Sequence, residues 1–225
     1  MKVFLGLGMA LALAVSHAHA AAPSPAQQGL PGVFYDDAYV MGSPKAKVTV
    51  VEYASPVCSH CAHFDAEIFP KLKADLIDTG KVRFELREYL TEPIEIASPA
   101  VISARCTGRA GYFAFMEAFF RAQPEMGSGR PGSDPTTVMA RIAKGLGVDH
   151  DKFIACLTDP LAITKLNQRL DHADQVDHVR STPTLIVNGV RVRPDEAEWT
   201  VAPIERAVAD ALARSPAKKK APKGR

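Results

Sequence analysis

Cysteine, tryptophan and long apolar runs are all scarce in this sequence. Its 225 residues include 4 cysteines and 1 tryptophan. After residue 20, no apolar run approaches the roughly 20 residues that a helix needs to cross a bilayer. We therefore expect the mature protein to be soluble, and we interpret Trp199 as a packing residue rather than a recognition residue.

Strong charge of either sign is also missing, since the formal net charge is +2 at pH 7. This net positive charge is smaller than the charge contributed by Lys2 together with the Lys and Arg residues of the last eight positions. The rest of the chain is therefore net negative. A concentrated basic surface is the electrostatic signature of nucleic-acid binding. The composition therefore argues against a nucleic-acid partner.

The longest apolar run lies at the N-terminus and has the form of an export signal. Lys2 precedes the apolar residues 3–15, and Ala18-His19-Ala20 fits a cleavage site between small residues. This pattern predicts a cleaved signal peptide over residues 1–20, with a membrane anchor as the weaker alternative. We expect an exported protein, located in the periplasm if the cell is gram-negative.

Two segments have the composition of unfolded chain. Residues 21–42 are rich in Ala, Pro and Gln at their start and predict a flexible N-terminal lead-in, with a short first strand or a loop at residues 34–35 and 39–41. Residues 215–225 predict a basic disordered tail. The folded part is therefore expected between them.

The pair Cys58 and Cys61 is the strongest chemical motif. It directly follows the apolar stretch 48–54, and residues 62–76 then carry apolar side chains at helical spacing. This order places Cys58 in the first turn of a helix that begins where a buried strand ends. Free N–H groups and the positive end of the helix dipole lower a thiol pKa there. We expect Cys58 to form mixed disulfides with substrates and Cys61 to resolve them.

Other uses of a CxxC pair fit the sequence less well. A zinc site needs two further ligands at suitable spacing, but Cys106 and Cys156 stand alone, so we predict no metal site. Attachment of a c-type haem needs a His directly after the second Cys, where this chain has Ala62. A purely structural bridge over so short a loop would contribute little stability. His60 and His63 leave adventitious metal binding open.

The predicted order of elements is β-α-β, a helical block, and then β-β-α. Strands are expected over residues 47–54 and 81–89, the second one half-buried, with a helix over 58–78 kinked at Pro70 between them. The block has helices over 98–107 and 112–122, a loop over 123–133, and three further helices capped by Asp134, Asp149 and Asp159. Asn188-Gly189 predicts a hairpin between strands 184–187 and 190–193, and a last helix covers 200–214.

In combination, three features resemble the DsbA-like proteins of the thioredoxin superfamily, including alphaproteobacterial ones with a second disulfide. These features are CSHC after a buried strand, Ser181-Thr182-Pro183 before another strand, and the Asn-Gly hairpin. The resemblance runs from about Val48 to Leu212. It implies an α/β thioredoxin fold, a central mixed sheet flanked by helices. That fold is formed by residues 43–92 and 181–214, with an all-helical domain inserted over 93–180.

The resemblance also implies roles for residues around the redox pair. His60 fits the family pattern and is expected to act on the Cys58 thiolate, whereas Ser59 departs from the Pro common there and leaves the redox potential open. Pro183 matches the family's cis-proline. Ser59, Thr182 and Pro183 are expected to border the substrate, with the Thr182 backbone bonding an extended peptide.

Two further assignments rest on the resemblance. Glu52 occupies the place of a buried acid that exchanges a proton with Cys61, and its apolar neighbours favour burial, which would raise its pKa. Cys106 and Cys156 would form a second, structural disulfide in the helical domain. Two free buried thiols are the alternative.

The resulting hypothesis is a periplasmic thiol:disulfide oxidoreductase that introduces disulfides into reduced, unfolded exported polypeptides. It would act as a monomer without a cofactor other than the Cys58–Cys61 disulfide. A DsbB-type membrane partner linked to quinone would reoxidise it. The alternatives are a disulfide isomerase or reductase of the same superfamily and, further away, a metal carrier or a holdase.

Overall fold

The structure, a computed structural model, describes residues 38–214. The predicted signal peptide, most of the predicted lead-in and the basic tail lie outside these residues. The strands are β1 (Val40–Gly42), β2 (Val48–Ala54), β3 (Val82–Glu88), β4 (Thr184–Val187) and β5 (Val190–Val192). The helices are α1 (Ser59–His63), α2 (Phe69–Leu72), α3 (Ile94–Cys106), α4 (Gly108–Met126), α5 (Pro135–Gly145), α6 (His150–Leu157), α7 (Pro160–Gln175) and α8 (Val201–Arg214), with π-helical segments η1 (Phe64–Ile68) and η2 (Lys73–Ile77).

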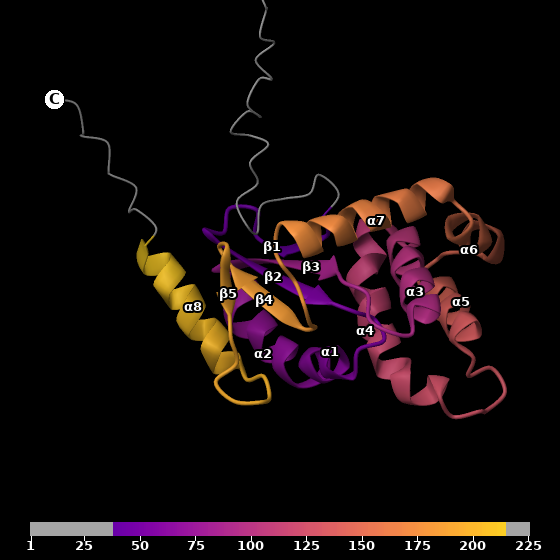
Figure 1. Cartoon of the computed structure of the whole chain (residues 1–225), viewed down its shortest axis with the longest axis horizontal. Helices are drawn as coiled ribbons and strands as arrows, with labels where there is room; N and C mark the ends of the chain where they lie inside the picture. Colours follow the sequence, from indigo (N-terminus) through magenta and orange to yellow (C-terminus); the bar gives the residue numbers. More distant parts are fainter. Residues whose placement is uncertain (1–37, 215–225) are drawn as a thin grey trace, which may run out of the picture.

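The strands form one mixed sheet in the order β1-β3-β2-β4-β5 (Figure 1). β2 pairs in parallel with β3 and antiparallel with β4, so it lies at the centre with neighbours on both edges. This position explains the nearly continuous apolar sequence of β2, because both of its faces are covered. The active-site turn follows directly from its C-terminal end.

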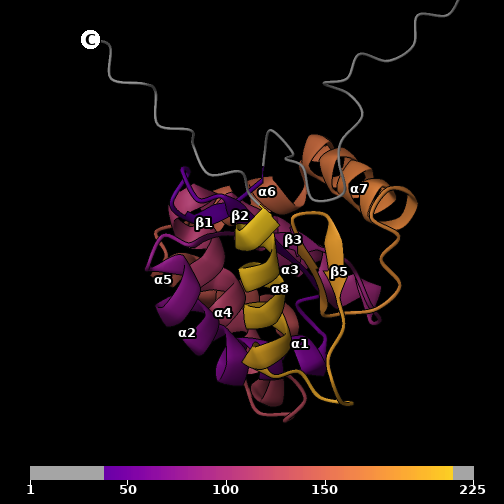
Figure 2. The ribbon, with the colours of Figure 1, turned by 90° about the vertical axis from the view of Figure 1, so that its left-hand side faces the viewer.

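Helices cover the two faces of the sheet. On one face, Val50 and Ala54 of β2 belong to the main core, together with Phe64 from the redox helix and Ile204 from α8. On the other face, Tyr53 belongs to a smaller cluster with residues of α7, β4 and the segment between them. Figure 2 shows α8 and α7 in these separate positions. Successive β2 side chains therefore enter different environments.

The inserted helical block consists of α3 to α7 and lies beside the sheet (Figure 1). Its predicted caps are confirmed. The carboxylates of Asp134, Asp149 and Asp159 accept hydrogen bonds from backbone N–H groups at the starts of α5, α6 and α7. Asn188 and Gly189 have φ values of 45° and 82°, as the predicted two-residue hairpin requires. The predicted fold, a mixed sheet with an inserted helical block, is confirmed.

The structure corrects three details. Val40–Gly42 pairs with β3 as strand β1, so residues 39–41 lie at the short strand and not in a loop, and the predicted flexible lead-in ends before them. α4 continues through Pro124 to Met126, where a loop was predicted. The predicted helix over 58–78 is divided into four short segments, and Pro70 lies in the first turn of α2.

The prediction that β3 is half-buried is wrong. Its polar residues Glu85, Arg87 and Glu88 are at most 3% exposed. Arg87 binds both Glu85 and Asp177, the latter from the segment after α7. Glu88 binds Arg105 of α3 and Arg169 of α7. Glu85 and Arg87 of the polar face, and Glu88 of the opposite face, thus form buried ion pairs instead of facing water.

Within residues 38–214, no helix combines the length and the apolar character needed to cross a membrane.

Candidate active site

The redox pair lies where the central strand ends and the first helix begins. Cys58 is the N-cap of α1, with extended backbone angles, and its N–H donates to the Ser55 carbonyl at 3.1 Å. Cys58 is half-buried, while Cys61, one turn later, is fully buried. Both sulfurs are free thiols in this structure. Attack from outside can therefore reach Cys58 more easily than Cys61.

The surroundings of the two sulfurs separate their acidities. A hydrogen bond from the Cys61 thiol contributes most to lowering the pKa of Cys58 to about 5, against the opposing effect of burial. Thr182 and the backbone N–H groups of Cys61 and His60 add to this stabilisation. Burial raises the pKa of Cys61 well above the ordinary value, and Cys58 and Glu52 raise it further. One sulfur is therefore a thiolate at neutral pH and the other a thiol.

The segment before β4 faces the redox pair. The Thr182–Pro183 peptide bond is cis. The Cys58 Sγ lies 3.5 Å from the Thr182 carbonyl oxygen, so these distant parts of the sequence meet at the attacking sulfur. The Thr182 Oγ1 is buried and has no hydrogen-bond partner among the described residues. It can therefore turn its O–H toward a sulfur anion.

Glu52 lies in β2 beneath the pair and is 4% exposed. Burial raises its pKa well above the ordinary range, and the charges of Asp65 and Cys58 raise it further. A carboxyl group kept protonated at neutral pH can give its proton to a thiolate that forms next to it. The sequence-based expectation of a buried acid with a raised pKa agrees with this geometry.

Asp65 is a second acid near the pair that the sequence analysis missed. It lies one helical turn after Cys61 and lines a cavity of about 80 Å³ together with Glu52. It also lines the open surface pocket that contains Ser59 and Gln123. Burial, with the nearby Glu117, raises the pKa of Asp65 to about 6. Asp65 therefore stands between the cavity of Glu52 and the solvent, and its i+4 spacing from Cys61 was the available signal.

The two residues between the cysteines are exposed. The side chains of Ser59 and His60 point to the surface, where Ser59 lines one pocket and His60 another. The N–H of His60 is one of the groups that lower the pKa of Cys58. An action of the His60 imidazole on the thiolate stays a prediction.

Gln123 of α4 holds the active-site turn from the side of the inserted block. Its Nε2 donates to the Pro56 carbonyl at 2.8 Å and to the Cys58 carbonyl at 3.2 Å. The sequence offered no signal for this contact, because residues 123–133 were predicted to form a loop. The redox turn is thus positioned by the helical block as well as by its own strand.

A groove runs beside the pair on the other side. It has a volume of about 420 Å³ and is lined by α1, the cis-proline segment, β5 and the loop after β5. Trp199 forms part of its wall and packs edge-on against Phe64, with ring centroids 6.2 Å apart. The tryptophan is therefore a packing residue, as predicted, and also borders the groove.

The remaining predicted site residues lie apart from the redox pair. Cys106 and Cys156 are joined by a disulfide between α3 and α6, with Cα atoms 6.0 Å apart. Among residues 38–214, no group of three or more His, Cys, Asp or Glu side chains has an arrangement that could hold a metal ion.

A mixed sheet that carries a CxxC pair at a helix N-terminus, opposite a cis-proline, defines a dithiol protein of the thioredoxin fold. The family described as Thioredoxin matches residues 36–206. This match covers well over half of the chain, so the chain belongs to that family.

The chain is similar to several proteins that are named for disulfide chemistry. A Rickettsia bellii protein named as a protein-disulfide oxidoreductase is 29% identical over 170 residues, covering 75% of this chain and 64% of the relative. Disulfide bond formation protein D of Bacillus subtilis is 28% identical, covering 66% of this chain and 67% of its own. Wolbachia pipientis alpha-DsbA1 shares the fold, with a TM-score of 0.69 and 24% identity, covering 80% of this chain and 96% of that one.

This chain thus spans less than two thirds of the length of the Rickettsia relative. The comparisons establish the family and the fold.

Proposed function

We propose that this protein is a thiol:disulfide oxidoreductase that introduces disulfides into exported polypeptides. The observation that carries the proposal is the contrast between the two thiols, because the pKa of Cys58 is about 5 whereas that of Cys61 is raised. A thiolate as stable as that of Cys58 is a good leaving group, so the oxidised pair gives up its disulfide readily.

The reaction begins with the oxidised Cys58–Cys61 pair. A substrate thiolate attacks the more exposed Cys58 sulfur, the Cys58–Cys61 bond breaks, and a mixed disulfide forms. Cys61 leaves as a thiolate in a buried site. The protonated Glu52 carboxyl can supply the proton that converts it to the thiol, since burial keeps that carboxyl neutral.

A second substrate thiolate then attacks the substrate sulfur of the mixed disulfide. Cys58 leaves as the stabilised thiolate, and the substrate departs with a new disulfide, having lost two electrons and two protons. The enzyme pair has gained both electrons and one proton, which is on Cys61, and the second proton has gone to solvent because Cys58 stays a thiolate. Glu52 regains its proton through the cavity that it shares with Asp65, which also borders the open surface pocket.

Substrate placement is proposed for the cis-proline side. The Thr182 backbone, next to Pro183, borders the groove and lies against Cys58, so it can hydrogen-bond an extended peptide whose cysteine reaches that sulfur. His60 borders the same groove, whereas Ser59 is proposed to meet the substrate from the neighbouring surface pocket. The Cys106–Cys156 disulfide is assigned a structural role in the helical block.

The cellular setting is proposed from the sequence pattern and the family resemblance. The apolar N-terminal segment supports export to the periplasm through cleavage of residues 1–20. Reduced, unfolded exported polypeptides would be the substrates of a monomer that needs no bound cofactor. A DsbB-type membrane protein linked to quinone would restore the disulfide.

The test is the equilibrium of the Cys58–Cys61 pair with glutathione, followed by alkylation and mass mapping so that Cys106 and Cys156 are counted separately. A pair far more oxidising than glutathione, together with rapid oxidation of a reduced polypeptide, supports the proposal. A pair as reducing as thioredoxin contradicts it and favours the isomerase or reductase alternative. That alternative also has a structural argument, because Thr182 precedes the cis-proline in such relatives. If the Cys58→Ser variant keeps the full activity of the protein, the holdase alternative is favoured instead. If the activity requires added metal, the metal-carrier alternative is favoured.

A further inference from the structure

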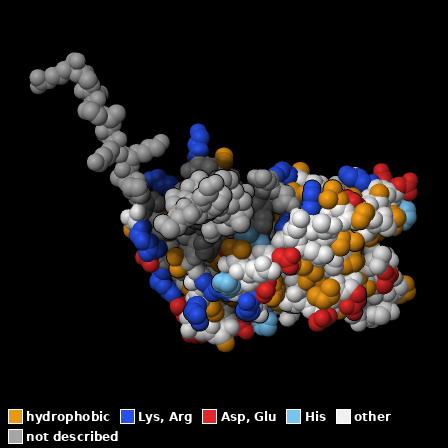
Figure 3. All heavy atoms as spheres, turned by 45° about the horizontal axis from the view of Figure 1, so that its top comes forward, with side chains coloured by type: hydrophobic (Ala, Val, Ile, Leu, Met, Phe, Trp, Pro, Cys, Tyr) orange, Lys and Arg blue, Asp and Glu red, His pale blue; other side chains and the backbone are white. Residues whose placement is uncertain are grey.

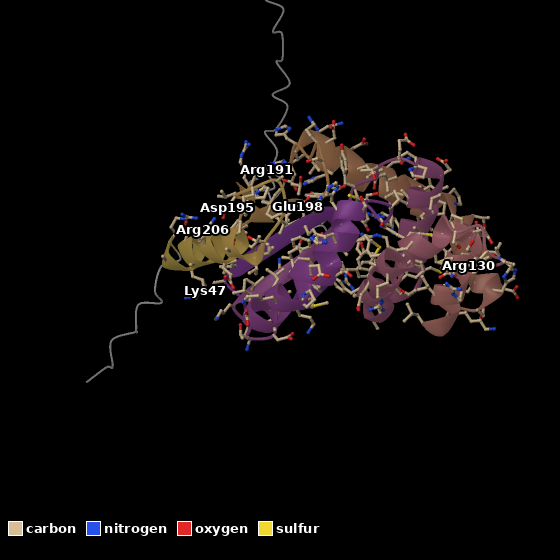
Figure 4. The ribbon with its side chains drawn as sticks, turned by 90° about the horizontal axis from the view of Figure 1, so that it is seen from below. Lys47, Arg130, Arg191, Asp195, Glu198 and Arg206 are labelled. Atoms are coloured by element: carbon tan, nitrogen blue, oxygen red, sulfur yellow. A yellow bond between two sulfur atoms is a disulfide. The ribbon has the colours of Figure 1, made fainter. Side chains whose placement is uncertain are left out.

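The groove beside Cys58 carries more positive than negative side chains. Its charged and titratable lining consists of Arg191 and Arg193 with His60 and His63, against one acid, Glu198. Figure 4 shows Arg191 and Glu198 at the same end of the molecule. In Figure 3, Lys or Arg, His and some Asp or Glu side chains lie at the lower left of the molecule. The charged side chains next to the attacking sulfur are therefore mainly cationic.

Neither arginine of the groove is paired with a carboxylate among the described contacts. The Arg191 Nη2 donates to the carbonyls of Asp177 at 2.6 Å and His178 at 2.9 Å. These neutral acceptors fix the guanidinium without cancelling its charge. Arg193 is exposed and has no ion pair or hydrogen bond to another described residue.

A nearby arginine shows the contrast. Arg206 of α8 forms two hydrogen bonds to the Asp195 carboxylate, at 2.5 and 2.7 Å, so its charge is neutralised within the protein. Glu198 of the same loop makes no such bond with Arg193 among the described contacts and offsets only one of the two groove arginines. The groove thus keeps a surplus of positive charge.

We propose that this groove selects substrate segments with acidic side chains next to the reacting cysteine, and that Arg193 is the main residue that recognises them. The inference rests on the proposed oxidoreductase activity and adds the substrate class to it. An extended peptide on the Thr182 backbone would place its flanking side chains along the groove wall. A guanidinium suits a carboxylate there, because it can donate two parallel hydrogen bonds.

The effect should be modest and sensitive to salt. Exposed ion pairs contribute about 0.2–1 kcal/mol each, which corresponds to roughly 1.4- to 5-fold in rate or affinity. Screening shortens the reach of these charges from about 10 Å at 0.1 M salt to about 3 Å at 1 M. The preference should therefore shrink as salt is added.

The test uses three peptides with the same two cysteines, flanked by Asp, Asn or Lys. The rate constant for their oxidation by the full-length oxidised protein is measured at low and high salt. Each rate is divided by the rate of the same peptide with the uncharged disulfide bis(2-hydroxyethyl) disulfide, because flanking charges also change the reactivity of the peptide thiol. We expect normalised rates in the order Asp, Asn, Lys, with about three- to tenfold between the extremes at low salt.

Arg193→Glu should flatten or reverse this order, and Arg193→Gln should weaken it. Glu198→Gln should strengthen it. Arg130→Glu is the matched control, because Arg130 is also exposed but lies at the opposite end of the molecule (Figure 4). It should leave the order unchanged.

Equal normalised rates for the three peptides would overturn the inference. An equal effect of Arg193→Glu and Arg130→Glu would also overturn it, because the preference would then depend on the net charge of the protein and not on the groove. If the protein oxidises none of the peptides, the proposed function itself fails. Oxidation of all three without preference leaves that function standing and removes only the inferred selectivity.

Discussion

Replacing Cys61 with Ala should make the Cys58 thiol markedly less acidic. With a pKa of about 5, the ratio of thiolate to thiol at pH 7 is about 100 to 1. The hydrogen bond from Cys61 is the largest contribution to that low value. A hydrogen bond to a charged group is worth about 1.5–3 kcal/mol, or roughly one to two pKa units. Because Cys58 is half exposed, we take the lower end and expect a Cys58 pKa of about 6 in Cys61→Ala.

The assay is the absorbance of the thiolate near 240 nm during a pH titration of reduced protein. Cys61→Ala is a clean variant for it, because Cys58 is then the remaining free thiol beside the Cys106–Cys156 disulfide. Ser59→Ala is the control, since Ser59 is exposed and is not among the groups that lower the Cys58 pKa. It should keep the wild-type midpoint.

The same pKa predicts how stability depends on pH. The folded pKa of Cys58 is lower than the ordinary value of 9.0, so the folded reduced protein loses its proton before the unfolded chain does. The thiolate therefore stabilises the reduced protein increasingly between pH 5 and 9, fully above pH 9, and not below pH 5. After allowance for solvent screening, we expect about 1–2 kcal/mol at pH 7. Urea unfolding of reduced and oxidised protein at pH 4.5 and 7.5 measures it.

Two results would refute this reasoning. A wild-type midpoint near 9 would mean that the site does not stabilise the thiolate at all. A midpoint that stays at about 5 in Cys61→Ala would mean that Thr182 and the helix N-terminus hold the anion without help from the second thiol.

Four further predictions concern the groups around the pair and the inserted block. Glu52→Gln should slow peptide oxidation near neutral pH, because the leaving Cys61 thiolate loses its proton donor. The Glu52→Gln variant should also be more stable than wild type at neutral pH. The folded pKa of Glu52 is raised, so the stability of the wild-type protein falls as pH rises above the ordinary carboxyl value of 4.5. Unchanged oxidation kinetics and an unchanged pH profile of stability would contradict this role of Glu52. Gln123→Leu removes two hydrogen bonds to the active-site turn and should shift the Cys58 titration midpoint, whereas a shift in melting temperature alone would show a merely structural contact. Glu88→Gln should cost about 3–5 kcal/mol in urea unfolding, since it leaves two buried arginines without their partner; a loss below 1 kcal/mol would show that the site is hydrated. The double variant Cys106→Ala/Cys156→Ala should lower the free energy of unfolding by about 4 kcal/mol while the Cys58 titration stays in place, and a moved midpoint would instead link the second disulfide to the active site.

The parts of the fold that the sequence predicts are those decided by near neighbours in the chain. The caps at Asp134 and Asp149 and the Asn188-Gly189 turn are confirmed, because a few adjacent residues determine each of them. The position of Cys58 at a helix start follows in the same way from the strand and helix patterns on either side.

What the sequence does not reveal depends on contacts between distant segments. The polar face of β3, with Arg83, Glu85 and Arg87, has the alternation of a solvent-exposed strand, and Arg87 is paired there with Asp177, 90 residues further along the chain. Gln123 reaches the active-site turn because α4 continues through Pro124, which local rules would place outside a helix. Neither contact produces a periodic pattern in the sequence from which it could be predicted.

These distant contacts show that the inserted block is part of the active-site structure. Gln123 fixes the carbonyls of Pro56 and Cys58 from one end of α4. Glu88, at the end of β3, joins Arg105 of α3 to Arg169 of α7. Since β3 pairs with β2, which leads into the redox turn, the turn is held both through the sheet and directly by α4. A change in the helical block can therefore alter the acidity of Cys58 without touching either cysteine, and the Gln123→Leu titration measures that effect directly.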